Sequence, residues 1–171
     1  MQYINTWFQA TKGTLFTLAL LLTLVSNASA KLNESDPLPD LSSFELSGEL
    51  PEIEGKVVLL DFWASWCAPC KASFPAMDEI YKDYKDRGFE ILAVSVDNTE
   101  KAYRSFADKS GVTFPLIHDQ AKKLVSTAEI EAMPTSFLID KKGIIRSVHK
   151  GYQGKKSIAT YREEIETLLA E

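Results

Sequence analysis

The chain has 171 residues, of which 24 are acidic, 19 are basic and 2 are cysteines, and its formal net charge is −5 at pH 7. A chain of this length fits one domain behind a leader. The mild acidity argues against nucleic-acid binding, which requires a basic patch. Two cysteines are too few for the disulfide framework of a small secreted domain.

The first thirty residues have the pattern of a secretory signal. They carry one charge, Lys12, followed by an apolar run over residues 15–25 and then by Ala28-Ser29-Ala30. This pattern predicts export and cleavage after Ala30. An uncleaved membrane anchor is the alternative, although the run is shorter than the roughly 20 apolar residues of a membrane span. Export favours a bacterial periplasm, where disulfides persist.

Residues 31–40 contain two prolines and are expected to form a linker or arm, and residues 41–171 a single domain. An edge strand is expected over residues 42–46. Residues 57–63 are apolar without alternation, which indicates a strand buried on both faces.

A long helix is expected to begin at the two cysteines, because Pro69 is tolerated in a first turn. Pro75 should kink this helix, and Gly88 should end it. The expected elements that follow are a strand over 89–96, a helix over 99–109, a strand over 113–117, a helix over 121–128, strands over 136–140 and 144–148, and a C-terminal helix. Strands that alternate with helices and end in a hairpin predict an α/β sheet with a mixed edge.

The two cysteines, Cys67 and Cys70, follow the buried strand directly. At a helix N-terminus, free main-chain N–H groups and the helix dipole stabilise a thiolate. We therefore expect Cys67 to be the exposed attacking thiol and Cys70 the buried resolving thiol of a disulfide exchange. A zinc site would need four ligands, and the other soft candidates are His118 and His149.

Asp61 lies inside the same buried strand, where a carboxylate is costly unless it is paired or protonated. Six residues before Cys67, it is expected beneath the start of the helix, where it could take a proton from Cys70. The alternative is a strand-end carboxylate that points to solvent or is satisfied by a backbone group.

Met133-Pro134-Thr135 precedes a predicted strand. A cis bond before Pro134 could expose the Met133 main chain to an extended substrate, as in strand addition. From composition alone, an ordinary trans proline at a strand start is the alternative. Trp66 is a candidate contact surface, whereas His118 and His149 are expected to be solvated.

Residues 61–71, with the sequence Asp-Phe-Trp-Ala-Ser-Trp-Cys-Ala-Pro-Cys-Lys, and the later Met133-Pro134-Thr135 motif resemble the thioredoxin superfamily. The resemblance extends from about residue 41 to the last helix, with an extra strand–helix unit inserted before the second motif. Together with the export signal, it resembles the TlpA/ResA group of extracytoplasmic thiol–disulfide oxidoreductases.

The resemblance implies a thioredoxin-like fold, a central mixed sheet flanked by helices. It also implies a cis bond at Pro134, Cys67 as the nucleophile, and Asp61 in the place of a buried carboxylate. The chain departs from the group at two positions. Ser73 replaces a characteristic Glu, which weakens the implied link to cytochrome c biogenesis. Asp61 replaces a frequent Asn, which makes the proton handling more similar to that of thioredoxin.

We therefore expect a periplasmic, monomeric enzyme without a cofactor that reduces protein disulfides by mixed-disulfide exchange and is recharged by a membrane thiol electron carrier. The residues expected to contact the substrate are Trp66, Pro69, Met133, Pro134 and Thr135. A metallochaperone or apocytochrome-binding module with Cys67 and Cys70 as ligands is the alternative. A peroxidase on the same fold is a third hypothesis. The absence of a Thr-x-x-Cys nucleophile site argues against it.

Overall fold

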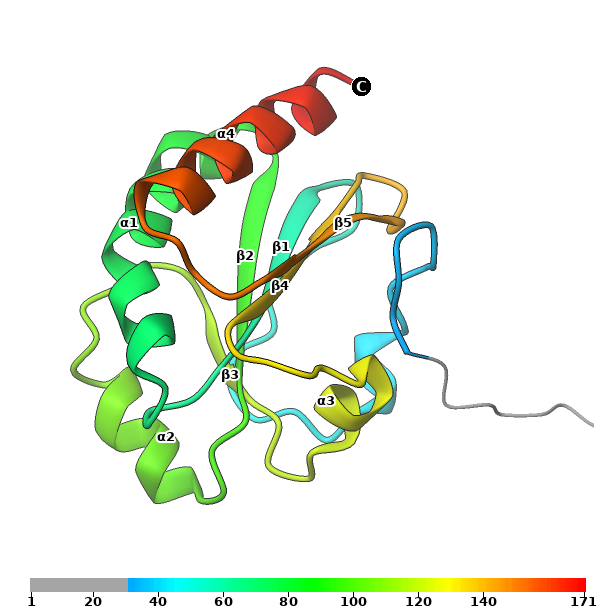
Figure 1. The fold of residues 1–171 in the computed structure, drawn as a ribbon. Helices are drawn as coiled ribbons and strands as arrows, with labels where there is room; N and C mark the ends of the chain where they lie inside the picture. Colours follow the sequence, from blue (N-terminus) through cyan, green and yellow to red (C-terminus); the bar gives the residue numbers. More distant parts are fainter. Residues whose placement is uncertain (1–30) are drawn as a thin grey trace, which may run out of the picture.

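The computed structural model describes residues 31–171, and the leader predicted for residues 1–30 lies outside that range. A five-stranded sheet with the order β3-β2-β1-β4-β5 forms its centre (Figure 1). The strands are β1 (Val57–Trp63), β2 (Phe89–Ser95), β3 (Leu116–His118), β4 (Thr135–Ile139) and β5 (Ile145–Lys150). β1, β2 and β3 are parallel, whereas β4 is antiparallel to both β1 and β5. The predicted mixed α/β sheet is confirmed.

Helices cover both faces of this sheet. They are α1 (Ala68–Tyr84), α2 (Glu100–Ala107), α3 (Lys123–Ala128) and α4 (Lys155–Ala170), with short 3-10 turns at Leu41–Ser43 and Lys85–Arg87. In Figure 1, α1 and α4 lie on one side of the sheet and α3 on the other. Among residues 31–171, no helix is both long and apolar enough to cross a membrane.

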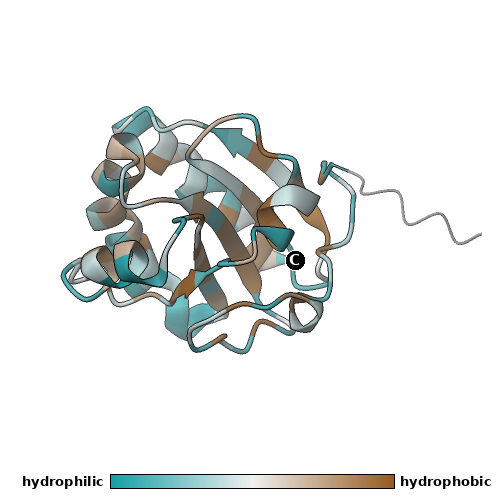
Figure 2. Ribbon diagram, turned by 90° about the horizontal axis from the view of Figure 1, so that it is seen from below, coloured by the Kyte–Doolittle hydropathy of each residue, from teal (hydrophilic) through white to brown (hydrophobic). Residues whose placement is uncertain are grey.

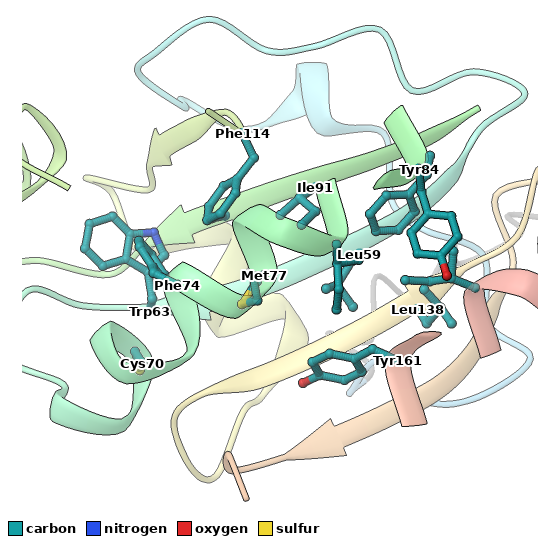
Figure 3. Packing of buried hydrophobic residues seen from close by; sticks show 14 of the residues in the cluster. Leu59, Trp63, Cys70, Phe74, Met77, Tyr84, Ile91, Phe114, Leu138 and Tyr161 are labelled. Carbon is teal, nitrogen blue, oxygen red and sulfur yellow. The ribbon is translucent and has the colours of Figure 1, made fainter. Parts of the chain in front are cut away.

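The alternation of side chains along β1 divides the core into two layers. Val57, Leu59 and Trp63 belong to the core cluster that contains residues of α1, α2 and α4, and Figure 3 shows Leu59 and Trp63 on this side. The intervening Val58 and Leu60 pack with α3 and the N-terminal arm. Because successive side chains of a strand point to opposite faces, Asp61 shares its face with Leu59 and Trp63, under α1. Figure 2 shows the apolar residues concentrated in the central strands.

α1 begins where the sequence predicted. Cys67 is the N-cap residue, and Pro69 lies in the first turn, where the missing N–H costs nothing. Pro75 lies inside α1, which continues past it to Tyr84. After a 3-10 turn, Gly88 ends the segment with a φ of 89°, a left-handed conformation that favours glycine.

The expected edge strand over residues 42–46 is wrong. Asp40 accepts a hydrogen bond from the Ser42 main-chain N–H and caps a 3-10 turn there instead. The preceding arm is packed against the domain, since Leu32 is buried and the N–H groups of Ser35 and Leu38 bond to carbonyls of the β4–β5 region.

β3 begins three residues later than expected. Thr113 donates both its main-chain N–H and its hydroxyl to Asp78 on α1, at 2.6 and 2.8 Å, which holds it away from the sheet. Pairing with β2 starts only where the Pro115 carbonyl accepts from Ala93.

Candidate active site

Cys67 and Cys70 are joined by a disulfide across the first turn of α1, with their Cα atoms 5.3 Å apart. The Cys67 sulfur also accepts a hydrogen bond from the Cys70 main-chain N–H at 3.3 Å. Cys70 is fully buried, and Cys67 is only 5% exposed. The open exposure expected of Cys67 is therefore wrong for this oxidised form, because its sulfur lies in the wall of a pocket. It remains the more accessible of the two sulfurs.

This pocket has a volume of about 690 Å³ and lies beside the disulfide. Its lining residues are Trp66, Cys67, Ala68, Pro69, Val96, Lys122, Val125, Ile130, Glu131, Ala132 and Met133. Trp66 is 65% exposed and is one of two large apolar side chains that the described residues present to solvent. The lining is mainly apolar, which is typical of a surface that binds polypeptide or another partly apolar ligand.

The Met133–Pro134 peptide bond is cis, as the resemblance implies. The segment is fixed on both sides, since the Thr135 hydroxyl donates to the Ala132 carbonyl at 2.7 Å and the Pro134 carbonyl accepts from Gly151 at 2.7 Å. Met133 lines the same pocket as Cys67. The Cys67–Cys70 pair and the Met133–Pro134 segment, which are far apart in the sequence, are therefore adjacent in the fold.

Asp61 is 1% exposed, so the solvated alternative is wrong. Its Oδ1 accepts a 2.6 Å hydrogen bond from the Ser136 hydroxyl, and its Oδ2 has no partner among residues 31–171. Burial raises the pKa of Asp61 to about 7, and the Ser136 hydrogen bond opposes that rise. A carboxyl group that titrates near neutral pH is suited to exchanging protons with a thiol.

Residues 36–148 match the AhpC/TSA family. The chain belongs to this family. It is 37% identical over 130 residues to the thiol-disulfide oxidoreductase ResA of Geobacillus kaustophilus, covering 74% of this chain and 75% of the relative. It is also 37% identical over 139 residues to the thioredoxin-like protein YneN of Bacillus subtilis, covering 78% of this chain and 81% of the relative.

The fold agrees with solved structures of similar proteins. A crystal structure from Chlorobium tepidum, described as a thiol:disulfide interchange protein DsbE, aligns with a TM-score of 0.74 and 33% identity over 81% of this chain and 99% of that one. StoA from Bacillus subtilis aligns with a TM-score of 0.56 and 26% identity over 64% of this chain and 84% of that one. This AhpC/TSA family member is a thiol–disulfide oxidoreductase of the ResA/DsbE type with a thioredoxin-like fold.

Asp97 is a buried carboxylate of this oxidoreductase that the sequence patterns do not single out. It is fully buried next to the pocket-lining Val96, two residues after β2, and accepts hydrogen bonds from both Ser65 and Ser95. Its main-chain carbonyl accepts from Lys122 and from His118. Burial lowers the pKa of Lys122, whose side chain also lines the pocket. The one sequence signal for Asp97 is its place in Ser95-Val96-Asp97, at the end of a predicted strand. This signal does not show that the carboxylate bonds to the loop that contains Ser65.

Both histidines differ from the expectation that they are solvated. His118 is fully buried: its ring stacks on Tyr103, its Nδ1 lies 2.8 Å from Glu100 and its Nε2 lies 2.9 Å from the Asp97 carbonyl. β3 ends against α2 and carries this ring inward.

His149 is half-buried on β5, with its Nε2 2.7 Å from Glu164 of α4. Its ring meets Tyr161 edge-on at 5.0 Å. In the part of the chain that the structure describes, no group of three or more His, Cys, Asp or Glu side chains is placed to hold a metal ion.

Proposed function

We propose that this oxidoreductase works in the periplasm, as a monomer, and reduces disulfides of exported proteins with Cys67 and Cys70. The single observation that carries the proposal is the position of Cys67, at the N-terminus of α1 and in the wall of an apolar pocket beside the Met133–Pro134 segment. Export is supported by the secretory pattern of residues 1–30. A reductase in an oxidising compartment must be recharged, for which we propose a membrane thiol electron carrier.

The reaction begins with both cysteines reduced. The Cys67 thiolate, stabilised by the main-chain N–H of Cys70 and by the helix N-terminus, attacks a substrate disulfide. One substrate sulfur leaves as a thiolate, and a mixed disulfide forms on Cys67. Trp66, Pro69 and Met133, which line the pocket, are proposed to hold the substrate chain during this step. Pro134 and Thr135, also expected from sequence to contact the substrate, are buried and do not line the pocket; we propose that they instead fix the Met133 main chain.

Cys70 completes the exchange. Asp61 takes the proton of the Cys70 thiol as that sulfur attacks Cys67. The second substrate thiolate leaves, and water protonates both substrate thiolates. Two electrons pass from the cysteine pair to the substrate, which leaves as a dithiol, while Cys67 and Cys70 end as the disulfide that the structure contains. Ser73 donates its hydroxyl to the Cys70 carbonyl at 2.8 Å and supplies no carboxylate at this position.

The experiment is to trap the intermediate. The full chain with Cys70→Ser is expected to accumulate mixed disulfides that a reducing agent releases, and mass spectrometry then identifies the captured proteins. The matched Cys67→Ser variant is expected to trap none. If Cys67→Ser traps and Cys70→Ser does not, the roles of the two thiols are reversed.

Two further measurements separate the alternatives. Reduction of insulin disulfides without added metal supports the reductase. Stoichiometric copper(I) binding that Cys70→Ser abolishes, with no disulfide reduction, would instead support the metallochaperone. Thiol-coupled consumption of hydrogen peroxide would support a peroxidase. If the trapped proteins are apocytochromes alone, the enzyme acts in cytochrome c biogenesis.

A further inference from the structure

Two hydroxyl groups, of Ser136 and Tyr161, form a chain of hydrogen bonds that ends at Asp61. Neither residue belongs to the cysteine motif or to the Met133-Pro134-Thr135 motif. Ser136 of β4 is the register partner of Asp61 across the sheet. The Ser136 oxygen lies 3.0 Å from the hydroxyl of Tyr161, which α4 contributes. Tyr161 is 2% exposed, so bulk water does not replace its partner. Figure 3 shows Tyr161 with its hydroxyl toward the side of the sheet where Cys70 lies.

The direction of the two hydrogen bonds follows from proton counting. An ionised carboxylate only accepts, so the Ser136 hydroxyl donates its single proton to Asp61. Their 2.6 Å separation is typical of a hydroxyl bonded to a carboxylate. Ser136 then has only lone pairs to offer, and Tyr161 must donate to it. Both protons therefore point toward Asp61 when that group is charged.

Asp61 has no ion-pair partner among residues 31–171: no lysine or arginine of that range forms a salt bridge with it. The titratable groups around the chain of hydroxyls are Tyr161 itself, Glu164 of α4, Tyr152 before that helix, His149 of β5 against the Tyr161 ring, and the cysteines of α1 when reduced. Burial and the charge of Asp61 raise the pKa of Tyr161 to about 12, so it stays a donor.

We propose that Ser136 and Tyr161 are positioning residues for Asp61: their hydroxyls donate in series to its Oδ1 and keep the carboxylate in the charged form that accepts the Cys70 proton. The unpaired Oδ2 is then the oxygen that receives the proton. This inference rests on the proposed function of Cys70 as the resolving thiol. It assigns to α4, the element farthest from the cysteines in the sequence, a part in the resolving step.

In that step Asp61 changes from carboxylate to carboxylic acid while Cys70 changes from thiol to disulfide sulfur. The proton later returns to water when the disulfide has formed. Ser136 and Tyr161 neither gain nor lose a proton overall. They stabilise the charged carboxylate, so their removal should make Asp61 hold its proton to higher pH.

The test uses Ser136→Ala and Tyr161→Phe, with Tyr103→Phe as the matched control. Tyr103 is also buried and also donates its hydroxyl, but to the Leu116 carbonyl away from Asp61. The pH midpoint of Asp61 ionisation is followed in the intact protein by its carboxyl infrared band. In the same variants, the rate at which a preformed mixed disulfide on Cys67 resolves is measured as a function of pH, which gives a second midpoint.

We expect Ser136→Ala to raise both midpoints by about one pH unit, a tenfold change in proton affinity. Tyr161→Phe should raise them by less, Ser136→Thr should restore the midpoints, and Tyr103→Phe should leave them unchanged. Tyr161→Phe removes one atom and keeps the test valid if Ser136→Ala does not fold. Unchanged midpoints in Tyr161→Phe and in folded Ser136→Ala would overturn the positioning role of the two hydroxyls. A wild-type protein that never resolves mixed disulfides would instead overturn the proposed function, and the infrared midpoints would still report on the positioning role.

Discussion

Asp97 and Ser65 are joined by three hydrogen bonds. The Ser65 main-chain N–H donates to both carboxylate oxygens, at 3.2 and 3.0 Å, and the Ser65 hydroxyl donates to Oδ1 at 2.7 Å. Ser65 stands two residues before Cys67, and Asp97 stands two residues after β2. A buried carboxylate thus fixes the loop that carries the attacking sulfur to the helix N-terminus.

Replacing Asp97 by Ala should therefore affect both stability and exchange. The donors of Ser65 and Ser95 would lose their buried acceptor, and we expect the free energy of unfolding to fall by roughly 2–4 kcal/mol. Slower insulin reduction should accompany this loss, because the loop before Cys67 is no longer held. Urea unfolding followed by tryptophan fluorescence measures the first effect.

The matched control for this substitution is Asp108→Ala, since Asp108 is exposed at the end of α2. Its free energy of unfolding should stay within about 0.5 kcal/mol of the wild type. Equal unfolding energies for the Asp97 and Asp108 variants would show that the Ser65 contacts contribute nothing to stability.

Asp61→Asn should stabilise the protein, and the gain should depend on pH. The pKa of Asp61 is about 7 in the folded protein, against an ordinary value of 3.8. Between these values the folded chain holds a proton that the unfolded chain releases, so the contribution of Asp61 to stability falls as pH rises from about 4 to 7 and is constant above. Asn cannot ionise and avoids this loss.

The difference in unfolding free energy between Asp61→Asn and the wild type, both oxidised, should be small at pH 4 and reach about 4 kcal/mol at pH 8. Denaturant unfolding across this pH range measures it. The same variant should resolve mixed disulfides more slowly, because Asn cannot take the Cys70 proton. A stability gain that does not change with pH would contradict the raised pKa.

The local motifs of the site could be predicted from sequence because their cues are contiguous. A strand without alternation followed by Cys67, Pro69 and Cys70 defines a strand–helix junction, and the period of the strand places Asp61 on the face under that helix. Met133–Pro134 needed the family resemblance, since composition alone favours a trans bond.

The supporting residues could not be predicted because their partners are distant in sequence. Tyr161 lies in the expected C-terminal helix, and helical periodicity places its ring on the apolar face of that helix. Periodicity does not show that its hydroxyl reaches Ser136, 25 residues away. His118 resembled a loop residue, and its burial depends on β3 ending against Tyr103 of α2. Such polar contacts follow from how elements pack, which hydrophobic periodicity does not specify.

Trp66 should matter for substrates and not for stability. It is 65% exposed and lines the pocket beside Cys67, so Trp66→Ala removes little buried surface. We expect the free energy of unfolding to change by less than about 0.5 kcal/mol. The rate of insulin reduction should fall about tenfold, because an exposed aromatic side chain at a binding surface contributes on the order of 1–2 kcal/mol to the complex.

Leu50→Ala is the control, since Leu50 is the other exposed large apolar side chain among the described residues and does not line the pocket beside Cys67. It should leave both unfolding and insulin reduction unchanged. Reduction of a small disulfide such as oxidised glutathione should be affected far less by Trp66→Ala than reduction of insulin. An equal loss with both substrates would mean that Trp66 acts on the cysteine pair itself and does not serve as a docking surface for polypeptide.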